Sequence, residues 1–189
     1  MNLEKIIESS EFNSIKAKYL YWNNFMHDKV EFNLGDSLIH STEHTSRVLL
    51  FALLLADHYQ LNPEDTDILA MAAVFHDTRR INDYRDTGHG ERAAAYYATY
   101  CVNSGLPYEK LTYLIISYHD RDDDLGISMI AEQFPNHEKA IFLYKIFKDS
   151  DGLDRLRLGS KWLDLNRLRT DYALKLLPLA KRLNGFTNA

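Results

Sequence analysis

Four side chains in three separate segments have the residue types of a metal-binding set. His76 and Asp77 are adjacent, His44 lies well before them and Asp151 well after them. Imidazole nitrogens combined with carboxylate oxygens suit a borderline-to-hard divalent ion such as Mn, Fe, Ni, Co or Mg, and Zn accepts the same ligands. Four protein ligands leave positions open for water and substrate, so the set predicts a catalytic type of metal site.

The adjacent pair His76 and Asp77 needs a particular backbone position. Neighbouring residues of a helix point about 100° apart, so both side chains reach one ion only near a helix end or a distortion. Residues 68–75 are apolar nearly all round, which is typical of a buried helix. Asn62 as N-cap and Pro63 in the first turn mark its start, and we expect it to end at about His76.

The two remaining candidates must come from other elements. His44 falls in the first turn of another apolar helix, which Ser41 or Thr42 can cap. If this helix runs antiparallel to the next one, with a short connection, His44 faces the His76–Asp77 pair. Asp151 is expected to begin a short helix and to present its carboxylate inward.

The rest of the sequence predicts helices and almost no strands. No convincing alternation of polar and apolar residues is bounded by hairpin turns. We expect seven to nine helices, an acidic loop over 121–126, and a last helix kinked by Pro178. The predicted fold is a single all-α domain over residues 1–189, a helical bundle with its core at about 38–160 and accessory helices at both ends.

The pattern His44 … His76-Asp77 … Asp151 resembles the H…HD…D signature of the HD superfamily of metal-dependent phosphohydrolases. The local contexts agree with this resemblance: Arg47 and Val48 follow the first histidine, an apolar segment precedes the pair, and 150–154 resembles the final segment of the family. The Leu and Asp spacing in that segment favours Asp151 over Asp149. The similarity covers roughly residues 38–160 and implies an all-α bundle of the HD-domain type.

The resemblance also assigns roles to two further histidines, His89 and His119. Histidines at such positions either bind a second metal or contact the phosphate in many members of the superfamily. His89 follows His76 closely, and this spacing favours one ion over two. We therefore expect Asp77 to orient or deprotonate a metal-activated water, and His119 or His89 to protonate the leaving oxygen.

Three arginines are candidates for binding phosphate, because a guanidinium grips phosphate oxygens in a forked geometry. Arg79 and Arg80 directly follow the HD pair, although they equally fit as favourable charges at a helix C-terminus. Arg47 lies on the same helical face as His44, and can bind phosphate or hold a ligand carboxylate. His89 is a fourth candidate for contact with the substrate. His40, four residues before His44, is expected at the surface.

The resemblance implies hydrolysis of a nucleotide or another small phosphate ester. The Glu-Asp pair found shortly after the HD dipeptide in (p)ppGpp hydrolases is missing here, where Thr78, Arg79 and Arg80 stand. The alternative is a non-catalytic HD-type domain that senses a ligand or binds a partner. A third interpretation, a helical adaptor with incidental histidines, requires four ligands in matching contexts to arise by accident.

The composition limits the partners and the location. The 189 residues carry a net charge of −5, which does not favour sequence-independent binding of nucleic acid. The longest apolar run, Val48–Ala56, is too short for a membrane span, which needs about 20 residues. A single cysteine, Cys101, fits a reducing compartment. We expect a cytoplasmic protein with a small phosphorylated substrate and neither nucleic-acid nor membrane partners, and homo-oligomers are left open.

Overall fold

Helices make up all regular secondary structure of residues 3–35, 37 and 42–186, the part of the chain that the computed structural model describes. The α-helices are α1 (Leu3–Ile7), α2 (Asn13–Lys29), α3 (Thr42–His58), α4 (Pro63–Phe75), α5 (His89–Ser104), α6 (Lys110–Tyr118), α7 (Asp123–Gln133), α8 (His137–Leu153), α9 (Asp171–Lys175) and α10 (Leu177–Leu183). Three short 3-10 helices, η1 (Ser10–Phe12), η2 (Asp154–Leu158) and η3 (Leu165–Arg167), complete the described segments. The all-α prediction is confirmed, although these segments hold ten α-helices and seven to nine were expected.

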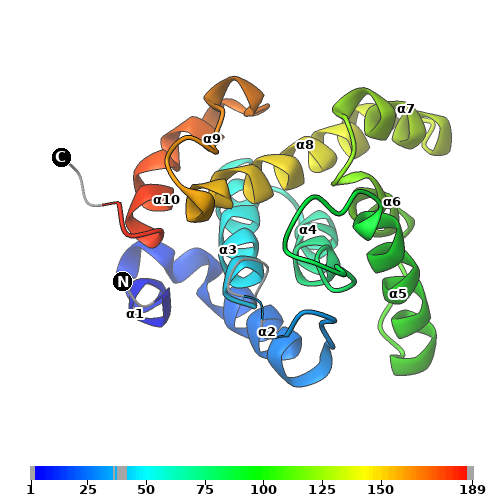
Figure 1. Cartoon of the computed structure of the whole chain (residues 1–189), viewed down its shortest axis with the longest axis horizontal. Coiled ribbons are helices and arrows are strands. Elements are labelled where there is room, and N and C mark those ends of the chain that lie inside the picture. Colours follow the sequence, from blue (N-terminus) through cyan, green and yellow to red (C-terminus); the bar gives the residue numbers. More distant parts are fainter. Residues whose placement is uncertain (1–2, 36, 38–41, 187–189) are drawn as a thin grey trace.

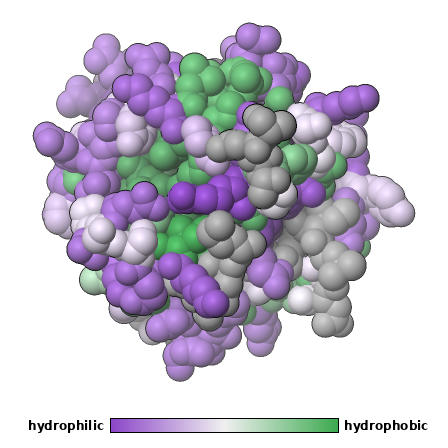
Figure 2. Space-filling view, turned by 90° about the vertical axis from the view of Figure 1, so that its left-hand side faces the viewer, coloured by the Kyte–Doolittle hydropathy of each residue, from purple (hydrophilic) through white to green (hydrophobic). Residues whose placement is uncertain are grey.

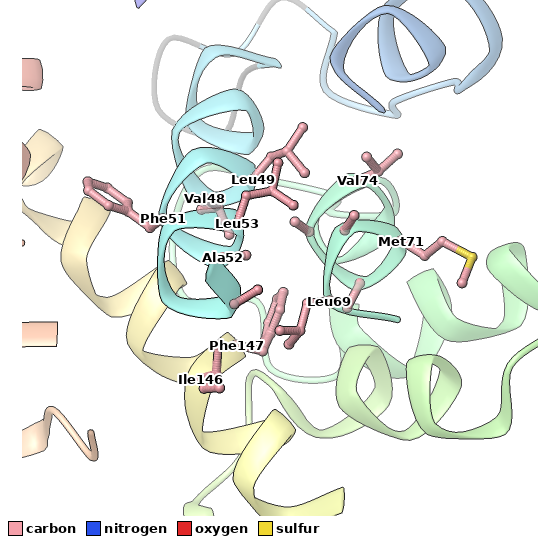
Figure 3. Packing of buried hydrophobic residues seen from close by; sticks show 14 of the residues in the cluster. Val48, Leu49, Phe51, Ala52, Leu53, Leu69, Met71, Val74, Ile146 and Phe147 are labelled. Atoms are coloured by element: carbon pink, nitrogen blue, oxygen red, sulfur yellow. The ribbon is translucent and has the colours of Figure 1, made fainter. Parts of the chain in front are cut away.

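The helices α3, α4 and α8 form the centre of the bundle (Figure 1). Their apolar side chains pack against one another, with Val48 and Leu53 on α3, Leu69 and Val74 on α4, and Phe147 on α8 (Figure 3). Each of these five residues is at most 1% exposed. The same buried cluster extends from α1 to α10, which supports the proposal that residues 1–189 form one domain.

Helix α4 begins where its capping residues predicted. The Asn62 side chain accepts a hydrogen bond of 2.8 Å from the backbone N–H of Asp65, and Pro63 occupies the first turn. The helix ends at Phe75 with His76 as its C-cap, so the predicted helix end beside the HD pair is confirmed. Of the two cap candidates for α3, Thr42 begins the helix. Ser41 and His40 lie outside the described residues.

The expected acidic loop over 121–126 is wrong, because α7 begins inside it at Asp123. Asp122 is the N-cap, and the acidic residues of the first turn are favoured by the positive end of the helix dipole. Gly126 lies in the second turn of α7 and is needed there, because a Cβ atom would collide with the ring of Tyr144. The run of aspartates is therefore a helix start.

The position of Asp151 also differs from the prediction. It lies within α8, which runs unbroken from His137 to Leu153, and it does not begin a short helix. In the sequence, the polar run from Asp149 to Gly152 resembles the end of one helix and the start of another. Within the helix, however, the Ser150 hydroxyl donates to the carbonyl oxygen of Ile146 at 2.8 Å. This polar side chain therefore finds a partner without ending the helix.

The C-terminal helices and the surface complete the architecture. The last helix expected from the sequence is divided at Leu176 into α9 and α10, and Pro178 lies in the first turn of α10. Hydrophilic side chains surround smaller hydrophobic areas on the face shown in Figure 2. None of the described helices combines the length and the apolar sequence that crossing a membrane requires.

Candidate metal centre

Four buried histidines converge on the carboxylate of Asp77, and each comes from the end of a different helix. His44 lies in the first turn of α3, His76 caps the C-terminus of α4, His89 begins α5 and His119 caps the C-terminus of α6. The helices α3 and α4 pack together, as do α5 and α6 (Figure 1). In each pair, the N-terminus of one helix thereby lies next to the C-terminus of the other.

The imidazole Nε2 atoms form two close pairs around Asp77. His44 Nε2 lies 3.2 Å from His76 Nε2, and His89 Nε2 lies 2.8 Å from His119 Nε2. Asp77 Oδ2 is 3.6 Å from the nitrogen of His44, whereas Oδ1 is 2.9 Å from that of His89. Two three-residue groups therefore share Asp77, and the ligand atoms within each lie within 4.8 Å of one another.

The other ring nitrogen of each histidine is held by an oxygen acceptor. The contacts are His76 Nδ1 to Ala73 O at 2.7 Å, His89 Nδ1 to Asp86 O at 2.6 Å, His119 Nδ1 to Ile116 O at 2.7 Å, and His44 Nδ1 to Asp154 Oδ2 at 2.7 Å. A carbonyl oxygen only accepts, so Nδ1 carries the hydrogen and a neutral ring turns the lone pair of Nε2 toward Asp77. This is the usual arrangement of histidines that bind a metal, and the residues fit a divalent ion.

Burial and charge act differently on the individual imidazoles. Burial lowers the pKa of His76 to about 3, so its ring is neutral at physiological pH. Burial and Arg157 also act to lower the pKa of His44, but the Asp151 and Asp154 carboxylates outweigh them and raise it. Burial likewise lowers the pKa of His89, and its hydrogen bond to Asp77 raises it overall. His44 and His89 thus hold a proton more readily than His76.

The structure brings Asp151, and not Asp149, to the histidines. Asp151 Oδ1 is 3.4 Å from His44 Nε2, although Asp151 belongs to neither of the two three-residue groups. Asp149 is fully buried and accepts hydrogen bonds from the backbone N–H groups of Arg169 and Thr170. Asp149 therefore holds the chain segment before α9, while Asp151 lies beside His44 at the edge of the candidate metal centre.

Of the three candidate arginines, Arg80 lies at the centre. Its NH1 atom is 3.6 Å from Asp77 Oδ1 and 3.2 Å from His89 Nε2, and its NH2 atom donates to the Tyr84 carbonyl oxygen at 2.8 Å. The Arg80 side chain is buried, and its Nε atom has no hydrogen-bond partner among the described residues. A buried guanidinium whose NH1 lies beside the histidines is well placed for an anion.

The other two arginines are engaged elsewhere. Arg79 stacks on the Tyr96 ring at 3.3 Å from its centroid and donates to the Glu31 carbonyl oxygen at 2.6 Å. Arg47 forms a forked pair with Asp154, through Nε to Oδ1 at 2.6 Å and NH2 to Oδ2 at 3.0 Å. The structure does not bring Arg79 to the histidines, and it places Arg47 on the carboxylate that supports His44.

Sequence reasoning assigned no role to Asp154 or Asp120. Asp154 is fully buried and binds His44 Nδ1, and Asp120 accepts a hydrogen bond from the Gly88 N–H just before His89. The signal for Asp154 was its position one helical turn after Asp151, which places both on one side of the chain. Asp120 directly follows His119, and this neighbourhood in the sequence was the only indication that Asp120 lies near the histidines.

The fold and the site define an all-α protein with a buried histidine–aspartate centre suited to divalent ions. The family model described as "HD domain" matches residues 42–156, and the chain belongs to this family. The matched residues include every histidine of the centre, Asp77 and Asp151. The HD domain places the chain in a superfamily that consists mostly of metal-dependent phosphohydrolases. Comparisons with curated proteins and with solved structures gave no match.

Proposed function

We propose that this chain is a metal-dependent phosphohydrolase acting on a nucleotide or another small phosphate ester. The observation that carries the proposal is the set of four imidazoles whose Nε2 atoms face one shared carboxylate, each ring fixed through Nδ1. A domain that only senses ligands has no need of a complete ligand set, so this observation favours the enzyme. The cytoplasmic location of the protein remains a prediction from the sequence, and so does the formation of homo-oligomers.

Two arrangements of the metal centre fit the side chains. In the first, His44, His76 and Asp77 hold one ion, with Asp151 at its edge. In the second, His89 and His119 hold another ion and Asp77 is shared. A bound divalent ion supplies Lewis acidity that activates water and polarises a phosphoryl oxygen.

The protein groups around the centre supply binding and proton transfer. The Arg80 guanidinium, whose NH1 lies beside Asp77 and His89, binds a phosphoryl oxygen and offsets the negative charge of the substrate in a water-poor site. Asp77 accepts a hydrogen bond from the attacking water and orients it. In the one-ion arrangement His89 Nε2, whose pKa the Asp77 carboxylate raises, holds the proton that passes to the leaving oxygen, with His119 as the other donor.

The test measures metal content and turnover together. Purified chain and an Asp77→Ala variant are stripped with chelator, titrated with Mn²⁺ and analysed for bound metal. Each is then assayed against nucleoside mono-, di- and triphosphates and p-nitrophenyl phosphate. The matched control is Asp124→Ala, which removes an exposed carboxylate from the first turn of α7.

We expect one or two Mn²⁺ ions per wild-type chain and about 100-fold or greater loss of turnover in Asp77→Ala, since several kcal/mol of transition-state stabilisation come from the metal. Two ions would assign His89 and His119 as ligands, and one ion would leave them for proton transfer. A wild-type chain that takes up no Mn²⁺, or turnover that survives Asp77→Ala, would overturn the proposal. Metal without turnover of any substrate would favour the sensing domain.

A further inference from the structure

Asp154 on η2 links the candidate metal ligand His44 to Arg47 on the same helix and to Asn184 near the C-terminus. Its Oδ2 atom accepts from His44 Nδ1 at 2.7 Å, and both of its oxygens accept from Arg47 on α3. A further donor is Asn184, whose Nδ2 lies 3.1 Å from Asp154 Oδ1. Each carboxylate oxygen thus accepts two hydrogen bonds, and this full set of donors fixes the plane of the carboxylate.

Asn184 comes from the C-terminal helix, outside the segment that the family model matches. It caps the C-terminus of α10, where its Nδ2 also donates to the Ala180 carbonyl oxygen at 3.0 Å. In Figure 1, α10 lies beside the end of α8, from which η2 and Asp154 continue. The hydrogen bond to Ala180 holds the Asn184 amide in place, so it meets Asp154 in a defined orientation.

We infer that Asn184 is a positioning residue for the metal centre: it holds the Asp154 carboxylate in the orientation that keeps His44 turned toward Asp77. The inference rests on the proposed metal function and extends the centre beyond residues 42–156. The outer partner of an imidazole ligand fixes the orientation of the ring, and its loss typically weakens metal binding. Without the Asn184 donor, Asp154 Oδ1 keeps only the Arg47 Nε–H, so the carboxylate is held less firmly and His44 loses part of its fixed orientation.

The C-terminal helix offers a matched control for this role. Arg182, two residues before Asn184, donates from NH2 to Glu11 Oε1 at 3.1 Å, and both side chains are largely exposed. An Arg182→Ala change loosens the same helix from the N-terminal segment without touching Asp154. If Asn184 acted only by docking α10, changes at Arg182 and Asn184 would have similar effects.

The experiment measures the Kd of Mn²⁺ by calorimetry and the melting temperature without metal, on full-length chains. The variants are Asn184→Leu, which keeps the approximate shape and removes the donor, Asn184→Ala, which adds no apolar bulk, and Arg182→Ala. Loss of a direct partner of a metal ligand typically costs roughly 10- to 100-fold in affinity. Asn184 is one contact further away, so we expect Mn²⁺ to bind about 3- to 10-fold more weakly.

The outcomes separate this inference from the proposed function. Weaker Mn²⁺ binding in the Asn184 variants, with Arg182→Ala within about twofold of wild type, supports the positioning role. A folded Asn184→Ala chain with the wild-type Kd overturns it, and so does equal weakening by Arg182→Ala. An unfolded Asn184→Leu chain leaves the decision to Asn184→Ala. A wild-type chain that binds no Mn²⁺ overturns the metal centre itself.

Discussion

Two aspartates on one helix, Asp149 and Asp151, show how the same residue type takes different roles. They are two positions apart, so their side chains point about 200° apart around α8. Burial raises the pKa of Asp149 despite its hydrogen bonds to Thr170 and Arg169. Burial also acts to raise the pKa of Asp151, but His44 outweighs it and holds that pKa well below the usual range. One carboxylate is held by the backbone of 169–170, and the other lies beside His44.

This difference predicts opposite results for two substitutions. Asp149→Ala leaves buried N–H and O–H donors of 169–170 unpaired, so it should lower the free energy of unfolding by about 2 to 4 kcal/mol. Asp151→Ala removes a carboxylate beside His44 and should weaken Mn²⁺ binding with a smaller loss of stability. Urea denaturation and calorimetry measure both effects. Loss of Mn²⁺ binding in a fully stable Asp149→Ala chain would reverse the assignment.

At the scale of the elements, the centre depends on how closely helix ends approach. Gly90, next to His89, lets α5 lie against the end of α6. A Cβ atom at this position would come within 2.6 Å of the Ile116 carbonyl oxygen and 2.9 Å of that of Ser117. These atoms are backbone, so they cannot turn aside as a flexible side chain would. The 2.8 Å separation of His89 and His119 therefore requires a glycine at position 90.

Gly90→Ala should consequently separate the two helices. We expect the free energy of unfolding to fall by about 1 to 3 kcal/mol, as for other overpacked sites. Any metal held by His89 and His119 should also be lost before metal held by His44 and His76. The control is Gly35→Ala, where the added Cβ would lie 3.9 Å from the nearest atom, the Phe32 carbonyl oxygen. Equal stability of the two variants in denaturant would contradict the close approach.

The sequence predicted those elements whose ends carry local signals. Asn62 and Pro63 gave the start of α4, and the apolar run before His76 gave its end. The aspartates at 122–124 were less informative, because acidic residues are common both in loops and in the first turn of helices. The roles of His89 and His119 stayed open for another reason. Their meeting depends on the packing of α5 on α6, which spacing along the chain does not show.

For the molecule as a whole, a charged network joins the C-terminal segment to the helices behind the centre. Arg169 binds Asp123 on α7 through Nε at 2.6 Å and NH2 at 2.9 Å, and reaches Asp149 on α8 at 3.3 Å. Lys148 lies 3.3 Å from Asp123 and donates to the His119 carbonyl oxygen at 2.8 Å. The network therefore connects 169–170 to the end of α6, where one histidine of the centre lies.

This network gives the stability of the whole chain a specific dependence on pH. Burial acts to raise the pKa of Asp123, but Arg169 and Lys148 outweigh it and lower the pKa below its ordinary value. A lowered pKa stabilises the folded state above the unfolded value, near pH 4, and this stabilisation disappears as the pH falls through the folded pKa.

The Asp123→Asn variant should therefore have a lower melting temperature than wild type at pH 7, and this difference should shrink from pH 4 downward. The exposed neighbour variant Asp124→Asn is the control for the loss of one charge in the first turn of α7. A difference between Asp123→Asn and wild type that stays constant from pH 7 to about pH 3 would show that the Asp123 charge does not stabilise the fold.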